Sequence, residues 1–155
     1  MAGWKSFCCA IDFSEPSRLA MAEAAELTRR LDGQLELLHV HPLPPPAVAI
    51  EAVPVSADVM ETTIRELGDT MVPWQEDAAR IAAGRPVRST VVPGLAADEI
   101  VRFAREHAVD CVVVGSRGRQ GLTRLLLGSV AERVVREAPC PVLVIRGGEP
   151  GSAKS

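Results

Sequence analysis

A segment rich in glycine and arginine, residues 115–129, is the part of this sequence whose residue types and spacing could do chemistry. Its glycines and arginines are Gly115, Gly118, Gly121, Gly128, Arg117, Arg119 and Arg124. Glycine allows the main chain to approach a ligand closely, and the local positive charge opposes the net charge of −3 of the whole chain. Residues 128–131 begin an expected helix, whose unpaired N–H groups attract phosphate oxygens. The segment therefore indicates an anion site, with a polyphosphate as the natural ligand.

The same segment also has a purely structural interpretation. Ser129 and Glu132 have the spacing of a capping box, in which the serine hydroxyl bonds to an N–H group of its own helix. Glycine-rich turns are common after parallel strands. Neither the P-loop pattern G-x-x-x-x-G-K-S/T nor the dinucleotide glycine fingerprint occurs in the chain. Composition alone leaves ligand binding and a plain connection open, and it disfavours a typical P-loop hydrolase or dehydrogenase.

Outside this segment, Asp12 is the most informative carboxylate. It follows an apolar run, where it could contact a ligand or cap the next turn. His39 and His41 share one face of an expected strand, but the metal-ligand spacing C-x2-C is missing, so we expect no metal site and assign both to packing or to a pocket rim. No Ser-His-Asp or Cys-His arrangement occupies a recognised nucleophile elbow, and Gln120 is the one candidate for activating a water. We predict binding without an assigned reaction.

Short apolar runs alternate with helical stripes and define the elements that must position these residues. The apolar runs predict strands at 7–11, 35–40, 87–92, 111–114 and 141–145. Helical spacing predicts helices from Ser14 to near Gly33 and over 57–83, 96–107 and 130–138. Prolines at 42 and 44–46 are expected to end the second strand, since each lacks a donor. Gly68 and Pro73 predict a kink or a break in the second helix.

Buried strands that alternate with amphipathic helices are typical of a parallel sheet covered by helices on both faces. We therefore predict an α/β fold with a single doubly wound, five-stranded sheet in one domain, as the length of 155 residues also suggests. Ligands of such sheets bind outside the carboxyl ends of the strands, where the strand order reverses. A site that includes Asp12 and Gly115 fits this rule, because both residues follow a strand.

The composition argues against several classes of function. With 47% hydrophobic and 24% charged residues, the chain can build a packed core. The mild negative charge and the aromatic content of 3% argue against nucleic-acid binding, which uses basic faces and aromatic platforms. No apolar run reaches the roughly 18 residues of a membrane span, and the N-terminus lacks the pattern of a secretory signal. We expect a cytoplasmic protein with no nucleic-acid or membrane partner and with its four cysteines reduced.

The glycine pattern resembles that of a known family. Gly115-x2-Gly118-x9-Gly128-Ser129 matches the ATP-binding branch of the universal stress protein family, and the stretches 12–17 (DFSEPS) and 139–144 (PCPVLV) are similar to that family's start and end. The likeness covers nearly the whole chain. It implies a flavodoxin-like or Rossmann-like sheet of order 3-2-1-4-5 within a nucleotide-binding domain at 1–146, and we expect a disordered tail at 147–155.

The resemblance also implies a ligand and its contacts. ATP, with or without Mg, would bind between the first and fourth strands. Asp12 would contact the ribose or adenine, and Val40 would meet the adenine through its main chain. The residues that would hold the ribose and phosphates are Gly115, Gly118, Gly128, Ser129 and Val130. The motif does not fix the arginines, of which Arg117 is included as a candidate phosphate contact.

A homodimer is a further implication of the resemblance. Its contact would run through the last strand, formed by Val142, Leu143, Val144 and Ile145. The implied function is that of an ATP-binding regulatory protein of the stress response, whose nucleotide occupancy changes the surface offered to an unidentified protein partner. Two alternatives stay open: a protein-interaction module of the same fold that binds no nucleotide, and a slow ATPase or phosphotransferase.

Overall fold

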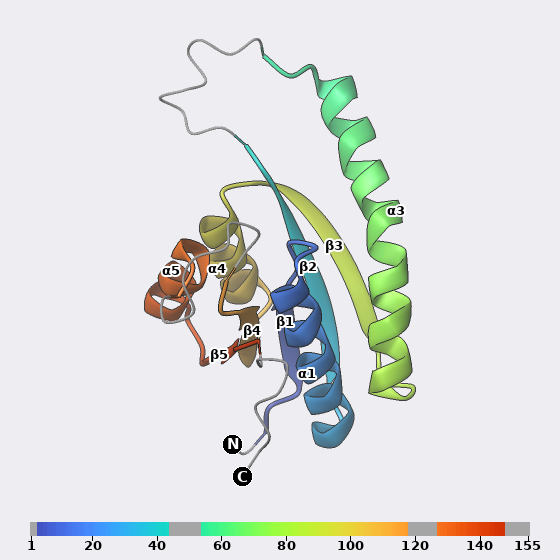
Figure 1. Ribbon diagram of the computed structural model, residues 1–155, viewed down its shortest axis with the longest axis vertical. Coiled ribbons are helices and arrows are strands. Elements are labelled where there is room, and N and C mark those ends of the chain that lie inside the picture. The colour runs from blue at the N-terminus through green and yellow to red at the C-terminus, as the bar shows by residue number, and fades with distance from the viewer. Residues whose placement is uncertain (1–2, 44–53, 118–126, 148–155) are drawn as a thin grey trace.

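A five-stranded parallel sheet forms the centre of the protein (Figure 1). The computed structural model describes residues 3–43, 54–117 and 127–147. The strands are β1 (Ser6–Ala10), β2 (Gln34–Pro42), β3 (Val87–Gly94), β4 (Cys111–Gly115) and β5 (Val142–Ile145). Their order is β3-β2-β1-β4-β5, and all neighbouring strands are parallel, which confirms the predicted doubly wound α/β fold.

Two pairs of helices cover the two faces of this sheet (Figure 1). One face carries α1 (Glu15–Leu31) and α3 (Ala57–Ala82), and the other carries α4 (Ala96–Glu106) and α5 (Ser129–Glu137). Successive side chains of a strand point to opposite faces, so Leu37 packs with Met21 on the first face and Leu38 packs with Ile100 on the second. All four cysteines are free thiols, three of them buried.

β2 extends to Pro42, which corrects the expectation that the prolines end the strand before that residue. Main-chain groups of alternate strand residues point to opposite edges of the strand. Leu43 N donates to Gly94 O of β3 at 3.1 Å, so Pro42 points its main chain to the opposite edge. That edge is the β1 side, and β1 ends opposite Leu38. Pro42 therefore fits the strand because its position requires no donor.

α3 runs without a break through Gly68 and Pro73, so the predicted break is absent. Packing explains the continuity: the half of α3 that contains Pro73 buries Met71, Trp74 and Ala78 against the sheet. Burial of such a face stabilises a helix more than the propensity of its individual residues. Although α3 has 26 residues, neither it nor any other helix in the described part of the chain has the length and hydropathy of a membrane span.

The position of Gly68 gives a prediction about stability. Apart from the adjoining backbone of α3 itself, no described atom lies within 4 Å of the place where a Cβ would stand at Gly68, and the residue sits in the interior of α3. Gly68→Ala is expected to raise the free energy of unfolding by about 0.5–1 kcal/mol, because alanine loses less backbone freedom in a helix. Urea unfolding measures this change. Gly33→Ala should act in the opposite direction, since its Cβ would lie 2.6 Å from Lys5 O.

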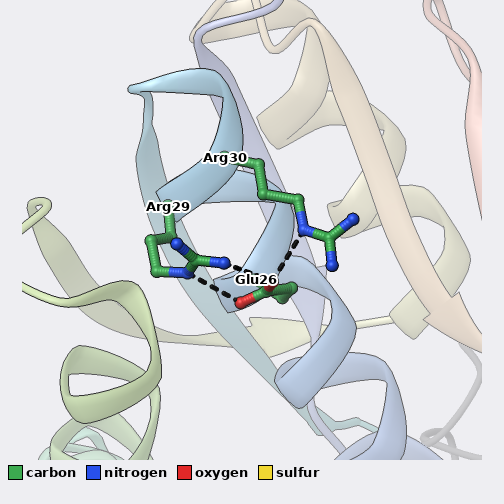
Figure 2. Close-up of polar contacts among 3 residues, drawn as sticks. All are labelled: Glu26, Arg29 and Arg30. Carbon is green, nitrogen blue, oxygen red and sulfur yellow. Dashed lines mark hydrogen bonds and ion pairs between the residues drawn. The ribbon is translucent and has the colours of Figure 1, made fainter.

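Glu26 in α1 accepts hydrogen bonds from two arginines near the end of the helix (Figure 2). Arg29 donates from Nε at 2.9 Å and from Nη2 at 2.6 Å, and Arg30 donates from Nε at 2.6 Å. These hydrogen bonds, that of Arg29 first, lower the pKa of Glu26 from its ordinary 4.5 to about 2. The cluster therefore stabilises the folded chain only while the carboxyl is charged.

We expect Glu26 to remain mostly ionised at about pH 3, where an ordinary glutamate is protonated. Because its folded pKa lies below its unfolded one, the stabilisation is present above about pH 4.5 and is lost as the pH falls toward 2. NMR titration of the carboxyl carbon measures the midpoint. Arg29→Met should move the midpoint up toward 4.5, whereas an ordinary midpoint in the wild type would contradict these contacts.

Candidate functional site

A cavity of about 610 Å³ opens where β1, β2 and β4 end, beside the first turn of α5. Its volume is that of a pocket for a small organic ligand. The predicted site residues that line it are Asp12, Val40, Gly115, Arg117, Gly128, Ser129 and Val130. The strand order reverses between β1 and β4, so the cavity lies at the switch point where doubly wound sheets bind their ligands.

The remaining predicted residues of the glycine segment fall outside the described part of the chain. Gly118 is among them, as are Arg119, Gln120 and Arg124. Arg117 is described, is partly buried and reaches the cavity wall. The cavity thus brings together predicted residues from four separate stretches of the sequence, and their contact with a ligand stays a prediction.

Asp12 follows β1 and fulfils the structural role that the sequence left open. Its Oδ1 accepts a hydrogen bond from Ser14 N at 3.0 Å and another from Ser14 Oγ. Ser14 in turn caps α1, because its Oγ accepts from Ser17 N at 3.3 Å. Among the described residues, Asp12 Oδ2 has no hydrogen-bond partner. One oxygen therefore fixes the turn, and the second is available to a ligand in the cavity.

Val40 contributes its main chain to the cavity because β2 extends beyond the end of its neighbour β1. Leu38 O accepts from Ile11 N at 2.8 Å, so the even-numbered residues of β2 point their N–H and C=O groups toward β1. β1 ends opposite Leu38, and two residues further on the corresponding groups of Val40 face the cavity. The side chain of Val40 is buried on the α4 side of the sheet. A donor and an acceptor from one residue therefore lie at the cavity wall.

α5 presents the N-terminal end of a helix to the same cavity. Gly128 is its N-cap and Ser129 its first residue, with no side-chain hydrogen bond at the cap. This finding corrects the capping-box interpretation, because Ser129 lies inside the helix and does not cap it. Gly128 N donates to Ser116 O at 2.7 Å, and the first bond inside the helix runs from Glu132 N to Gly128 O at 2.9 Å. Among the described residues, nothing accepts from the N–H groups of the first turn, which are left for an anion.

Sequence reasoning did not identify part of the cavity wall. Ser17 of α1 lines it and is buried, with its Oγ donating to Ser14 O at 2.9 Å. Ala96 and Ile100 of α4 supply an apolar wall on the side of Val40. Their spacing of four residues is a helical signal, but it did not distinguish a cavity wall from an ordinary core face. The apolar wall suits a flat ring.

A doubly wound five-stranded sheet with a glycine-lined cavity at its switch point defines the flavodoxin-like class of α/β proteins. The sequence matches the model of the Universal stress protein family over residues 3–146. The chain belongs to that family, which confirms the resemblance found in the glycine pattern.

Individual relatives agree with this assignment. Universal stress protein MJ0531 of Methanocaldococcus jannaschii is 32% identical over 143 residues, covering 92% of this chain and 82% of the relative. The solved structure of hypothetical protein MJ0577 from the same organism is similar with a TM-score of 0.79 and 26% identity, covering 94% of this chain and 98% of the other. A universal stress protein from Archaeoglobus fulgidus, solved in complex with dAMP, has the same fold with a TM-score of 0.64 and 22% identity, covering 92% and 98%.

Proposed function

We propose that this protein binds ATP in the cavity at the switch point and acts as a regulatory protein of the stress response in the cytoplasm. The observation that carries the proposal is the convergence of three groups on one cavity: the main chain of Val40, the carboxylate of Asp12 and the first turn of α5. Together these groups can meet a base, a sugar and a phosphate chain. The Archaeoglobus relative that holds dAMP supports an adenine nucleotide as the ligand class.

The main chain of Val40 favours adenine over guanine. It offers an N–H donor and a C=O acceptor toward the cavity, as the strand parity requires. Adenine presents a ring-nitrogen acceptor beside its N6 amino donor, so both groups of Val40 can be satisfied. Guanine carries the O6 acceptor in place of the amino group, which leaves a carbonyl facing a carbonyl. The ring would lie against the apolar wall of Ala96 and Ile100.

The phosphates would be held at the other end of the cavity. Unpaired N–H groups of the first turn of α5 and the positive end of its dipole suit phosphate oxygens. Ser129 adds an exposed hydroxyl, and Arg117 adds a cation at the cavity wall. Within the described residues, no three His, Cys, Asp or Glu side chains could hold a metal ion together. A Mg ion would therefore arrive with the phosphates and be coordinated chiefly by them.

Calorimetric titration of the full chain tests the proposal. ATP should bind with a stoichiometry of one per chain, and GTP should bind at least tenfold more weakly, as the loss of one hydrogen bond and an unpaired carbonyl require. ADP and AMP should bind progressively more weakly because they make fewer contacts with α5. Phosphate release measured in the same samples reports any hydrolysis. Absence of heat with every adenine nucleotide would refute the proposal and leave a protein-contact module.

We also propose that the protein forms a homodimer through β5. β5 is an edge strand of four residues, so one of its edges is unpaired within the described part of the chain. Leu143 in β5 is 37% exposed, and Val135 in the adjacent α5 is 47% exposed. Leu143 shares the α1 face of the sheet with Ile145, and Val135 belongs to α5 on the opposite face. Because α5 also carries the N-terminus that would hold the phosphates, occupancy can be coupled to a partner surface. Gel filtration with light scattering, with and without ATP, measures the state, and Leu143→Glu should yield monomers.

A further inference from the structure

The ring of His39 donates a hydrogen bond to the carbonyl of Ile11, just after β1. In a regular sheet, a main-chain N–H group would donate to this carbonyl. His39 Nδ1 lies 2.6 Å from Ile11 O. A carbonyl oxygen can only accept, so Nδ1 carries the proton in this hydrogen bond. The side chain is 7% exposed and lies on the face of the sheet covered by α1 and α3. His39 thus joins β2 to the residue just before Asp12.

The continuation of the strand ladder shows which group the ring displaces. Ile11 N donates to Leu38 O at 2.8 Å, as in a regular parallel pair. The next bond of such a pair would run from Val40 N to Ile11 O. Within the described part of the chain, that carbonyl is taken by the ring, and the amide of Val40 does not bond to it. The N–H group of Val40 therefore makes no hydrogen bond to Ile11, and it faces the cavity instead.

Aromatic packing fixes the ring in this position. Phe13 has a φ of 64°, a left-handed conformation that turns the chain sharply after Asp12. The turn places the Phe13 ring 4.5 Å from the His39 ring and 5.7 Å from that of Trp74 in α3. The guanidinium carbon of Arg18 lies over the Trp74 ring, 4.1 Å from its centre. The imidazole is held between the sheet and these rings, so it can compete with a main-chain donor.

We infer that His39 is a positioning residue for the base: by taking the Ile11 carbonyl, it keeps the Val40 amide available for adenine. The inference rests on the proposed function, because adenine is the ligand that this amide would meet. In this inference, the side chain of His39, on one face of the sheet, controls a contact made by the main chain of Val40 at the end of β2. No contact between His39 and the nucleotide is required.

The first test uses the protein without nucleotide. In the wild type, NMR hydrogen exchange should show a Val40 amide that exchanges at least tenfold faster than that of Leu37, which lies inside the sheet. In His39→Phe, which keeps a ring but removes the donor, Val40 N should bond to Ile11 O and become protected. His39→Leu serves if the phenylalanine does not fit. Equal exchange of Val40 in the wild type and in a folded variant would overturn the inference.

The second test measures affinity for the ligand. His39→Phe should weaken ATP binding about tenfold, the value of one hydrogen bond to the base, and ribose 5-triphosphate, which has no base, should be unaffected. His39→Asn should restore ATP binding, because its amide N–H can stand near the place of Nδ1. His41→Phe, on the same face of β2, is the matched control and should bind ATP like the wild type. A loss of the same size for ribose 5-triphosphate would indicate a purely structural role and overturn the inference.

The two tests separate this inference from the proposed function. If the wild type binds no nucleotide, the proposed function fails, while the exchange of the Val40 amide still decides whether His39 controls it. If ATP binds and Val40 exchange is unchanged by the substitutions, the proposed function stands and the role of His39 is wrong.

Discussion

Gly128→Val is expected to abolish ATP binding while the protein remains folded. Gly128 has φ −60° and ψ 154°, a conformation that any residue can adopt, so the backbone does not require glycine there. Gly128 is nevertheless buried and lines the cavity at the first turn of α5. A valine side chain would fill the space in front of the N–H groups that are proposed to bind phosphate. We therefore expect the missing Cβ at Gly128 to serve the proposed ligand.

Thermal unfolding with and without ATP measures this effect. At a ligand concentration of 100 times Kd, the wild type should gain about 2.7 kcal/mol of stability, and Gly128→Val should gain none. Gly68→Ala is the control, since it alters a glycine far from the cavity in sequence and should keep the full gain. Circular dichroism checks that each variant folds. An unchanged ATP-dependent gain in a folded Gly128→Val would remove α5 from the proposed site.

Gly115→Ala is expected to destabilise the fold itself. A Cβ at Gly115 would lie 2.9 Å from Pro16 C and 3.0 Å from both Pro16 Cβ and Pro16 O. Two of these are main-chain atoms at the start of α1, which cannot move aside as a flexible side chain can. The substitution should therefore lower the free energy of unfolding by about 1–3 kcal/mol, as overpacking does. It should also weaken ATP binding, because β4 and the start of α1 border the cavity.

Urea unfolding measures the loss, with Gly147→Ala as the matched control. Among the described residues, a Cβ at Gly147 would meet only Leu19 Cδ1, at the ordinary contact distance of 3.8 Å. This control should have the stability of the wild type. Full stability of Gly115→Ala would mean that β4 and α1 separate easily, and the close approach at Pro16 would then have no role in shaping the cavity.

The fold could be predicted from the sequence because local signals agreed with one another. Apolar runs and helical stripes gave the number and kind of the elements, and their alternation gave the parallel sheet. The errors came where long-range pairing overrode a local rule. Pro42 continues β2 because its main chain points to the edge along which β1 has already ended, and α3 passes Pro73 because Met71 and Trp74 are buried on either side of it.

The candidate site shows the same division. Asp12, Gly115 and Gly128 could be identified because their residue types and spacing carry information. The role of His39 could not be predicted, because it depends on β1 ending opposite Leu38 and on the turn at Phe13. Ser129 and Glu132 have a sequence pattern for capping, yet the helix begins at Ser129 and the pattern is not used. Capping depends on where the helix starts, and a tertiary contact, Gly128 N to Ser116 O, sets that start.

The proposed recognition of the base through the peptide group of Val40 has a consequence for how such a protein can diverge. Every amino acid except proline carries the same donor and acceptor at this position. Genetic drift at codon 40 can therefore alter the packing beneath α4 and leave the choice of base untouched. Selection on ligand preference would act instead on the residues that set the backbone conformation at the end of β2. That conformation, and not the side chain at position 40, would determine the choice of base.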